Sequence, residues 1–380
     1  MHIADTPAID LAQLLAQQFA GRAAQADREG RLPAEDVAAL KESGYLTLTV
    51  PRQFGGAELS MAETLAAHVE LARGSAASAM VAGMQLHIFG SAREHNPWSE
   101  QAFKMLCRAA LDGALINSVA SEPQLGSPSR GGLPATTATR ADNGWRLNGQ
   151  KTWTTGGRHL THMLVRANVE GEAGVLLVLQ DTPGVSWRES WRDALSLRAS
   201  DSHDVFFNDV LLPEHHLLAR GGPPPPPNAW FPMVMSAVYL GAALAARDAV
   251  IRFTLERVPT ALGKPIATLP KIQRQIGEID LALQAAQALF FAAATARDAA
   301  APDDYPAVYP QIVAAKYQVN EATTLATDLA LKVAGGSSIT PDLPLERHFR
   351  DVRAGSMQPP GGDTALEIIG RHAIEQSRQI

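Results

Sequence analysis

The sequence predicts an α+β fold in which an N-terminal helical domain, a small central β-sheet or barrel domain and a C-terminal four-helix bundle follow one another. Three observations carry this prediction. Helix start and stop signals punctuate the first 111 residues, apolar and polar residues alternate over residues 145–153, and apolar residues recur every three or four positions after residue 270. The expected domains cover residues 1–112, 113–222 and 223–380.

The first domain is expected to be all helical. Pro33 at the first turn of a helix precedes the apolar pair Val37 and Leu40, and the pattern stops at a glycine. Ser60 and Glu63 have the spacing of a capping box, in which each side chain satisfies a backbone N–H of the other residue. Helix starts are therefore predicted near residues 34 and 61.

The central domain is expected to be β-structure. The alternating segment 145–153 contains the pair Asn148-Gly149, which predicts a hairpin turn at that point. Further strands are predicted over residues 163–166, 175–179 and 205–212, where β-branched and apolar residues are bounded by Gly, Pro, Asn or Asp. Together they indicate a small sheet or barrel.

Five prolines, Pro223 to Pro227, follow this region and cannot lie in a helix or a central strand. They predict an extended surface linker, or alternatively a polyproline ligand for a partner domain. Beyond the linker, helical periodicity over residues 272–293 and 312–333 predicts long antiparallel helices.

Composition narrows the class of protein. The chain has 380 residues, of which 46% are hydrophobic and 19% charged, as in ordinary globular proteins of more than one domain. A formal net charge of -6 without a basic run argues against nucleic-acid binding. The lone Cys107 excludes an intrachain disulfide framework and fits the cytoplasm. We expect no apolar segment of spanning length, and therefore no membrane-spanning segment. We also expect no metal site from the residue pattern.

Two segments carry a resemblance to a known family. Residues 149–156, GQKTWTTG, and residues 346–353, ERHFRDVR, resemble the signature segments of the acyl-CoA dehydrogenase flavoproteins. Residues 54–60, 120–127, 196–210 and 257–273 resemble further family segments in the same order along the chain. The resemblance implies the same helices, sheet, helices organisation that the periodicity predicts.

The resemblance also implies a flavin cofactor, with FAD expected rather than FMN. The residues matching contacts to the isoalloxazine ring are Ala120, Ser121, Trp153, Thr154 and Thr155. Those matching the dinucleotide half are Arg257, Gln273, Gly335 and Gly336. For Trp153 the alternative is a core residue of a hairpin, and for the glycine pair it is a helix C-cap.

The family's catalytic base is missing. Dehydrogenation of an acyl thioester needs a base to remove the proton next to the carbonyl, but the position six residues after Arg353 is Pro359. Some family members carry the base on the first helix of the C-terminal domain, and the matching position in this chain falls near Phe231. Asp363 is the candidate for a relocated catalytic base; its alternative role is that of a helix N-cap.

Candidate substrate contacts are Ser127, Arg130 and His87, the last alternatively a packing residue. Three functions fit these observations: an FAD-dependent dehydrogenase of an acyl thioester or related small molecule, a flavin-dependent monooxygenase or other non-desaturating enzyme, and a catalytically silent flavin-binding protein. The resemblance also implies a homodimer or homotetramer with the flavin near the subunit interface.

Overall fold

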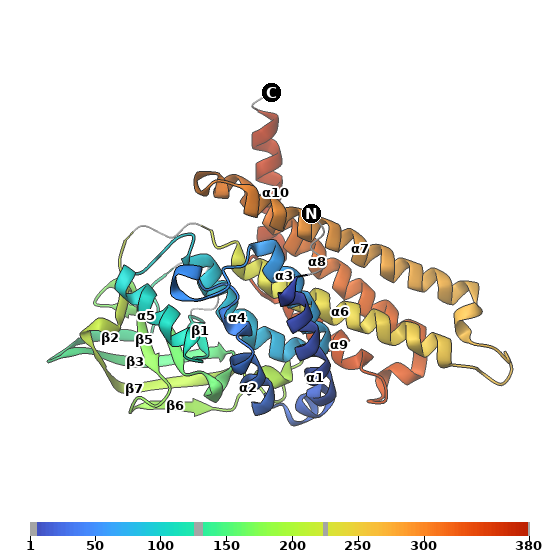
Figure 1. Cartoon of the computed structure of the whole chain (residues 1–380), viewed down its shortest axis with the longest axis horizontal. Helices are drawn as coiled ribbons and strands as arrows, with labels where there is room; N and C mark the ends of the chain where they lie inside the picture. The colour runs from blue at the N-terminus through green and yellow to red at the C-terminus, as the bar shows by residue number, and fades with distance from the viewer. Residues whose placement is uncertain (1–5, 125–131, 223–226, 379–380) are drawn as a thin grey trace.

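The computed structural model describes residues 6–124, 132–222 and 227–378, and confirms the order of helices, sheet and helices (Figure 1). The predicted linker at Pro223 to Pro227 lies almost wholly outside these residues. The N-terminal helices are α1 (Pro7–Glu29), α2 (Ala34–Glu42), α3 (Met61–Gly74), α4 (Ala76–Ala92) and α5 (Glu100–Leu111). The C-terminal helices are α6 (Trp230–Glu256), α7 (Pro270–Ala299), α8 (Tyr305–Ala334), α9 (Leu345–Asp351) and α10 (Gly362–Ser377).

The predicted capping box starts α3. The Glu63 N–H donates to the Ser60 hydroxyl, and the Ser60 N–H donates to the Glu63 carboxylate at 2.9 Å. The next two amides, of Met61 and Ala62, donate to the carboxylate of Asp298 in α7 at 2.7 and 2.8 Å. Because a carboxylate is favoured at a helix N-terminus, this contact ties the N-terminal domain to the C-terminal bundle.

The central strands form one mixed sheet. They are β1 (Ile116–Val119), β2 (Thr137–Ala141), β3 (Gly144–Thr154), β4 (His162–Val169), β5 (Glu172–Leu179), β6 (Val185–Arg188), β7 (His203–Pro213) and β8 (Leu217–Arg220). Their order in the described chain is β6-β7-β3-β2-β4-β5-β8, and β1 pairs with β4 in parallel. The strands predicted over residues 163–166, 175–179 and 205–212 are confirmed as parts of β4, β5 and β7.

The predicted hairpin turn at Asn148-Gly149 is wrong. β3 continues through these residues, and the turn between β2 and β3 lies at Asp142 and Asn143. Asn148 and Gly149 instead lie at a register shift against β7. Gly149 has a φ of +148° and an added Cβ would lie 2.7 Å from the Thr136 backbone, so the glycine serves a close approach within the sheet.

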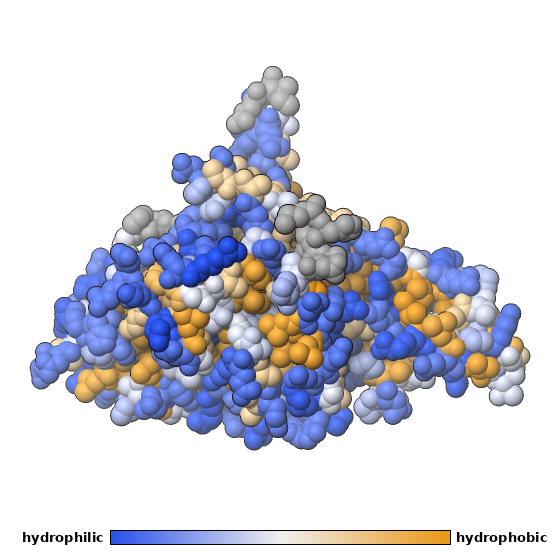
Figure 2. All heavy atoms as spheres, viewed as in Figure 1, coloured by the Kyte–Doolittle hydropathy of each residue, from blue (hydrophilic) through white to orange (hydrophobic). Residues whose placement is uncertain are grey.

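Helices α6, α7 and α8 pack along one another in the C-terminal bundle, and α10 contacts α8 and projects from the body (Figure 1). The expectation that no apolar segment has spanning length is wrong: by length and composition α6 and α7 are each apolar enough to span a bilayer. α6, however, is a buried core helix. α7 leaves part of its apolar surface exposed, including Leu281 and Leu289. Figure 2 shows that apolar side chains interrupt the polar surface of the molecule at several places.

Two glycines of α4 let this helix approach α6 closely. A Cβ on Gly90 would lie 2.3 Å from the Trp230 ring, and one on Gly83 would lie 3.0 Å from Val234. His87 lies between these two glycines in the sequence of α4, and its ring meets the ring of Phe231 edge to face at 5.1 Å. The close contact between α4 and α6 therefore places His87, a candidate substrate contact, against Phe231. Phe231 lies near the position where some family members carry the catalytic base.

Arg350 of α9 joins all three domains. Its guanidinium donates to both carboxylate oxygens of Asp27 in α1, at 3.1 and 2.5 Å, and to the backbone carbonyl of Leu195 in the central domain at 3.3 Å. Glu346, one turn earlier in α9, accepts at 2.7 Å. Since Asp27 and Arg350 are both buried, each charge depends on the other.

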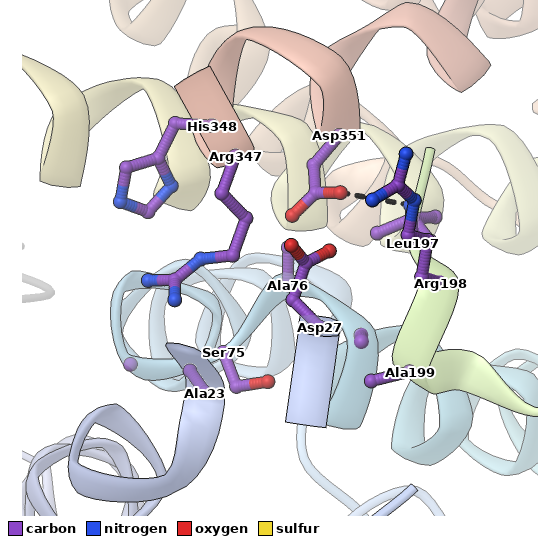
Figure 3. A pocket seen from close by; sticks show the side chains of 12 residues that line it. Ala23, Asp27, Ser75, Ala76, Leu197, Arg198, Ala199, Arg347, His348 and Asp351 are labelled. Carbon is purple, nitrogen blue, oxygen red and sulfur yellow. Dashed lines mark hydrogen bonds between the residues drawn. The ribbon is translucent and has the colours of Figure 1, made fainter. Parts of the chain in front are cut away.

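Further charged groups line a small cavity near Arg350. Figure 3 shows the carboxylates of Asp27 and Asp351 pointing toward one another, with Arg347 and His348 nearby. The Leu197 N–H donates to Asp351 at 2.8 Å. Burial, together with the negative charge of Asp27, raises the pKa of Asp351 to about 6.

We expect Arg350→Met to destabilise the protein by about 3–5 kcal/mol, because Asp27 would remain buried without its cation. Urea unfolding measures the change. The double variant Asp27→Asn with Arg350→Met should recover part of the loss, since residue 27 would no longer carry a buried charge. A single variant as stable as the natural chain would show that the ion pair does not hold the domains together.

The raised pKa of Asp351 predicts a pH-dependent stability. The folded state keeps this proton up to about pH 6, whereas the unfolded chain releases it near the ordinary aspartate pKa of 3.8. Stability contributed by the group therefore falls as pH rises from about 4 to 6. Asp351→Asn should flatten this slope in thermal unfolding, whereas Asp142→Asn in the exposed β2–β3 turn should not.

Candidate functional site

The two loops expected to hold the isoalloxazine ring lie together. Ala120 and Ser121 follow β1, and Trp153 and Thr154 end β3. The Thr152 N–H donates to the Ser121 carbonyl at 2.9 Å, and this bond joins the loops directly. Behind them, the Asn117 amide donates to the Thr155 carbonyl at 2.9 Å. The structure thus brings the five candidate ring contacts into one place.

A buried ion pair locks these loops. Lys151 Nζ lies 2.6 Å from the Glu122 carboxylate, and both side chains are almost fully buried. Glu122 also accepts from the backbone amides of Ala135 and Thr136 at 2.7 and 3.0 Å. Burial raises the pKa of Glu122, but the hydrogen bonds from Lys151 and Thr136 outweigh burial and lower it overall. Neither residue was singled out from the sequence.

Trp153 is not a core residue. Its side chain is 60% exposed, and its φ of +56° is unusual for a bulky residue. The strain occurs where β3 loses register with β7, between Lys151 and Thr154. The exposure of the side chain shows that the alternative of a hairpin core residue is wrong. Strained backbone that turns an aromatic side chain outward is a feature of binding sites.

Buried hydroxyls lie behind Trp153. The Thr155 hydroxyl is 2.9 Å from that of Ser202, which is 2.7 Å from that of Ser200. The Thr154 hydroxyl is also buried, but no hydrogen-bond partner for it exists among the described residues. A buried hydroxyl is costly without a partner, and a polar ring edge on this side would provide one. The residues therefore fit a flavin. Ser200 and Ser202 were missed, although the polar run 200–202 inside the family segment 196–210 was a usable signal.

The second group of cofactor candidates lies elsewhere in the protomer. The connection between α6 and α7, which contains Arg257, is at the opposite end of the molecule from β3 (Figure 1). Arg257 and Gln273 are exposed, and the Gln273 amide donates to Ala267 at 3.0 Å. Gly335 caps α8 with a φ of +59°, and the space around Gly335 and Gly336 is open. One protomer does not place the two groups on one flavin.

The position of the usual base lies after the 3-10 helix η10 (Val352–Met357). Pro359 stands there, and the carbonyls flanking it, of Gln358 and Pro360, accept from Lys316 of α8. Asp363 lies in the first turn of α10 and is exposed, whereas Gly361 is the N-cap residue. The N-cap interpretation of Asp363 is therefore wrong. Its carboxylate is favoured where it stands by the positive end of the helix dipole.

His87 is the one described candidate for a substrate contact, because Ser127 and Arg130 lie outside the described residues. Burial lowers the pKa of His87 to about 4, so the ring is neutral near pH 7. Its Nδ1 has no hydrogen-bond partner in the part of the chain that the structure describes. Along the same ranges, no three His, Cys, Asp or Glu side chains are grouped to hold a metal ion.

The unpartnered hydroxyl gives a direct test of flavin binding. Thr154→Val should leave the thermal stability of the apoprotein unchanged or raise it, because it removes a buried group that has no partner among the described residues. It should weaken FAD or FMN binding by about 1 kcal/mol, roughly fivefold, in a fluorescence titration. Thr139→Val on the exposed face of β2 is the matched control. Equal flavin affinity in both variants would remove Thr154 from the site.

Comparisons with known proteins agree with this architecture. Family models match in chain order: the acyl-CoA dehydrogenase N-terminal domain over residues 10–110, the middle domain over 118–210 and the C-terminal domain over 233–358. The Bacillus subtilis protein YdbM, whose name marks it as a provisional acyl-CoA dehydrogenase, is 38% identical over 95% of each chain. The mitochondrial short-chain specific acyl-CoA dehydrogenase of Bos taurus is 27% identical over 94% of this chain and 86% of its own.

Among solved structures, KijD3 in complex with FMN and dTDP-3-amino-2,3,6-trideoxy-4-keto-3-methyl-D-glucose superposes with a TM-score of 0.84. It is 26% identical and covers 97% of this chain, and the match covers 94% of KijD3. The three matched domains and the relative at 38% identity show that this chain belongs to the acyl-CoA dehydrogenase family of flavoproteins.

Proposed function

We propose that this protein is a flavin-dependent monooxygenase acting on a small organic molecule. The observation that carries the proposal is the absence of a carboxylate at both base positions of the family, which are Pro359 and Phe231 here. In the reaction, molecular oxygen and two electrons from reduced flavin convert the substrate to its oxygenated product, and the second oxygen atom leaves as water. A separate NAD(P)H-dependent flavin reductase would supply the electrons.

Oxygenation does not require removal of a proton next to a thioester carbonyl, and this is why the side chains favour it. A positioned base contributes roughly a hundredfold to ten-thousandfold to proton abstraction. Pro359 has no basic group. The imidazole of His87 lies against Phe231, but a pKa of about 4 makes it a poor proton acceptor near neutral pH.

The described side chains would bind and shield the cofactor. The indole of Trp153 offers a flat apolar face, and the Thr154 hydroxyl offers a buried donor for a polar ring edge. His87 and Phe231 would form an aromatic wall on the substrate side that excludes water. The bound flavin supplies the redox and oxygen chemistry. KijD3 supports this proposal because it carries FMN and a nucleotide-linked amino sugar, not a thioester.

A dehydrogenase of acyl thioesters is the second candidate. The names of YdbM and of the short-chain relative favour it. Asp363 is the carboxylate to test, since it follows Pro359 by four residues and is exposed at the start of α10. In that reaction Asp363 would accept the proton next to the carbonyl while the neighbouring carbon loses hydride to the flavin.

We further propose FAD as the cofactor, bound between copies of the chain. Arg257 is exposed, and no ion pair of its guanidinium is found among the described residues. The open backbone at Gly335 and Gly336 could approach a pyrophosphate without steric hindrance. Because one protomer separates these residues from Trp153, a second copy would have to supply them. Exposed Leu281 and Leu289 on α7 offer apolar surface for such an assembly.

The two enzyme functions predict opposite behaviour in solution. As a monooxygenase, the protein with bound flavin should stay oxidised when acyl-CoAs of several chain lengths are added without oxygen. It should consume oxygen when a flavin reductase and NADH are present. Anaerobic bleaching of the flavin by one acyl-CoA would overturn the proposal, and loss of bleaching in Asp363→Asn would then identify the base. Flavin that remains inert in both assays would favour a silent binding protein.

A further inference from the structure

One face of α8 holds the backbone turn that contains Pro359, the residue at the position of the family's usual base. Lys316 Nζ donates to the carbonyls of Gln358 at 2.9 Å and Pro360 at 2.7 Å. One helical turn later, the Asn320 amide donates to the carbonyl of Gly355 at 3.1 Å. Residues four positions apart lie on the same face of a helix. Three hydrogen bonds from two side chains therefore fix the backbone of residues 355–360.

Close packing against α6 and α8 leaves the backbone of this turn little room to move. A Cβ on Gly355 would lie 2.5 Å from Asn320 Oδ1 and 2.9 Å from the ring of Tyr239 in α6. Lys316 and Asn320 are only 3% and 6% exposed. The turn is thus seated on α6 and α8 by close contact as well as by hydrogen bonds.

The charge of Lys316 is unusual for a buried group. Along residues 6–124, 132–222 and 227–378, no carboxylate forms an ion pair with it. Burial lowers its pKa to about 8, so the ammonium still predominates at pH 7. A buried cation is costly without an anion, and a side chain serving only to fill space would be apolar. The carbonyls of the turn are the partners that the charge has.

We propose that Lys316 and Asn320 are positioning residues that fix the 355–360 turn as the substrate-facing wall of the flavin site. This inference rests on the proposed flavin site but not on the choice between oxygenation and dehydrogenation. The chain has a proline where the family carries its base, yet the backbone that presents this position is anchored from α8. The turn then presents a rigid wall beside the flavin ring, and Lys316 adds a positive charge behind it.

Hydrogen exchange of the apoprotein tests the anchoring. Lys316→Met, which removes two hydrogen bonds, and Asn320→Leu, which removes one, should each speed exchange of the amides in residues 354–358 and 361–363 by about tenfold or more. Lys104→Met, an exposed lysine of α5, is the matched control and should change nothing there. We call the contacts of Lys316 and Asn320 with the 355–360 turn the clamp. Unchanged exchange in both α8 variants would overturn the clamp, whether or not the protein binds flavin.

Flavin titration tests the positioning role. FMN and FAD are added to the natural chain and the variants, and affinity and the visible spectrum are recorded from pH 7 to 9. The natural chain should show a spectral change with a midpoint near pH 8, where Lys316 loses its charge, and Lys316→Met should lack it. Asn320→Leu should weaken flavin binding but keep the pH-dependent change, since it retains the lysine.

The outcomes separate this inference from the proposed function. Faster exchange with unchanged flavin affinity and no pH-dependent difference in the spectrum would make the clamp a purely structural feature and overturn the positioning role. Faster exchange with altered flavin binding supports the clamp, whatever the outcome of the acyl-CoA assay. Bleaching of the flavin by acyl-CoA would contradict only the proposal of a monooxygenase.

Discussion

The ion pair between Arg350 and Asp27 determines how the three domains of this molecule meet. It connects α9 to α1, while the same guanidinium reaches the carbonyl of Leu195 in the central domain. Such a contact is directional, because a planar guanidinium accepts few arrangements of its partners. The sheet and both helical domains are therefore held in one relation. The candidate site depends on that relation, since its parts come from all three.

Within this frame, the cofactor side of the site is rigid for electrostatic reasons. The Glu122–Lys151 pair is buried beneath the two loops and satisfies backbone amides around it. It holds Ser121 and Trp153 near one another at the edge of the sheet. The strain at Trp153 can persist because its neighbours are fixed in this way. An exposed indole and an unpartnered hydroxyl are the result, and both are explained by a ligand that covers them.

On the proposed substrate side, the backbone of the family scaffold is kept while the carboxylate of the usual base is absent. At Pro359 the proton acceptor is absent, whereas two side chains of α8 donate three hydrogen bonds to the backbone around it. The aromatic contact of His87 with Phe231 fills the other base position. Both changes remove negative charge from the place where a dehydrogenase needs it. Oxygenation by reduced flavin tolerates such a change because its reactive oxygen is delivered by the cofactor.

The sequence by itself determined the elements of this fold and the family segments from which the flavin contacts are predicted. Helical periodicity, the capping box at Ser60 and the strand patterns are local signals, and the structure confirms them. The prediction of a hairpin turn at Asn148-Gly149 was wrong because a β-bulge favours the same residue types as a turn. Only the tertiary structure decided that Lys151 pairs with Glu122, that Lys316 holds the turn, and that Arg257 lies far from Trp153. These facts depend on contacts between residues distant in the chain, and no local pattern encodes them.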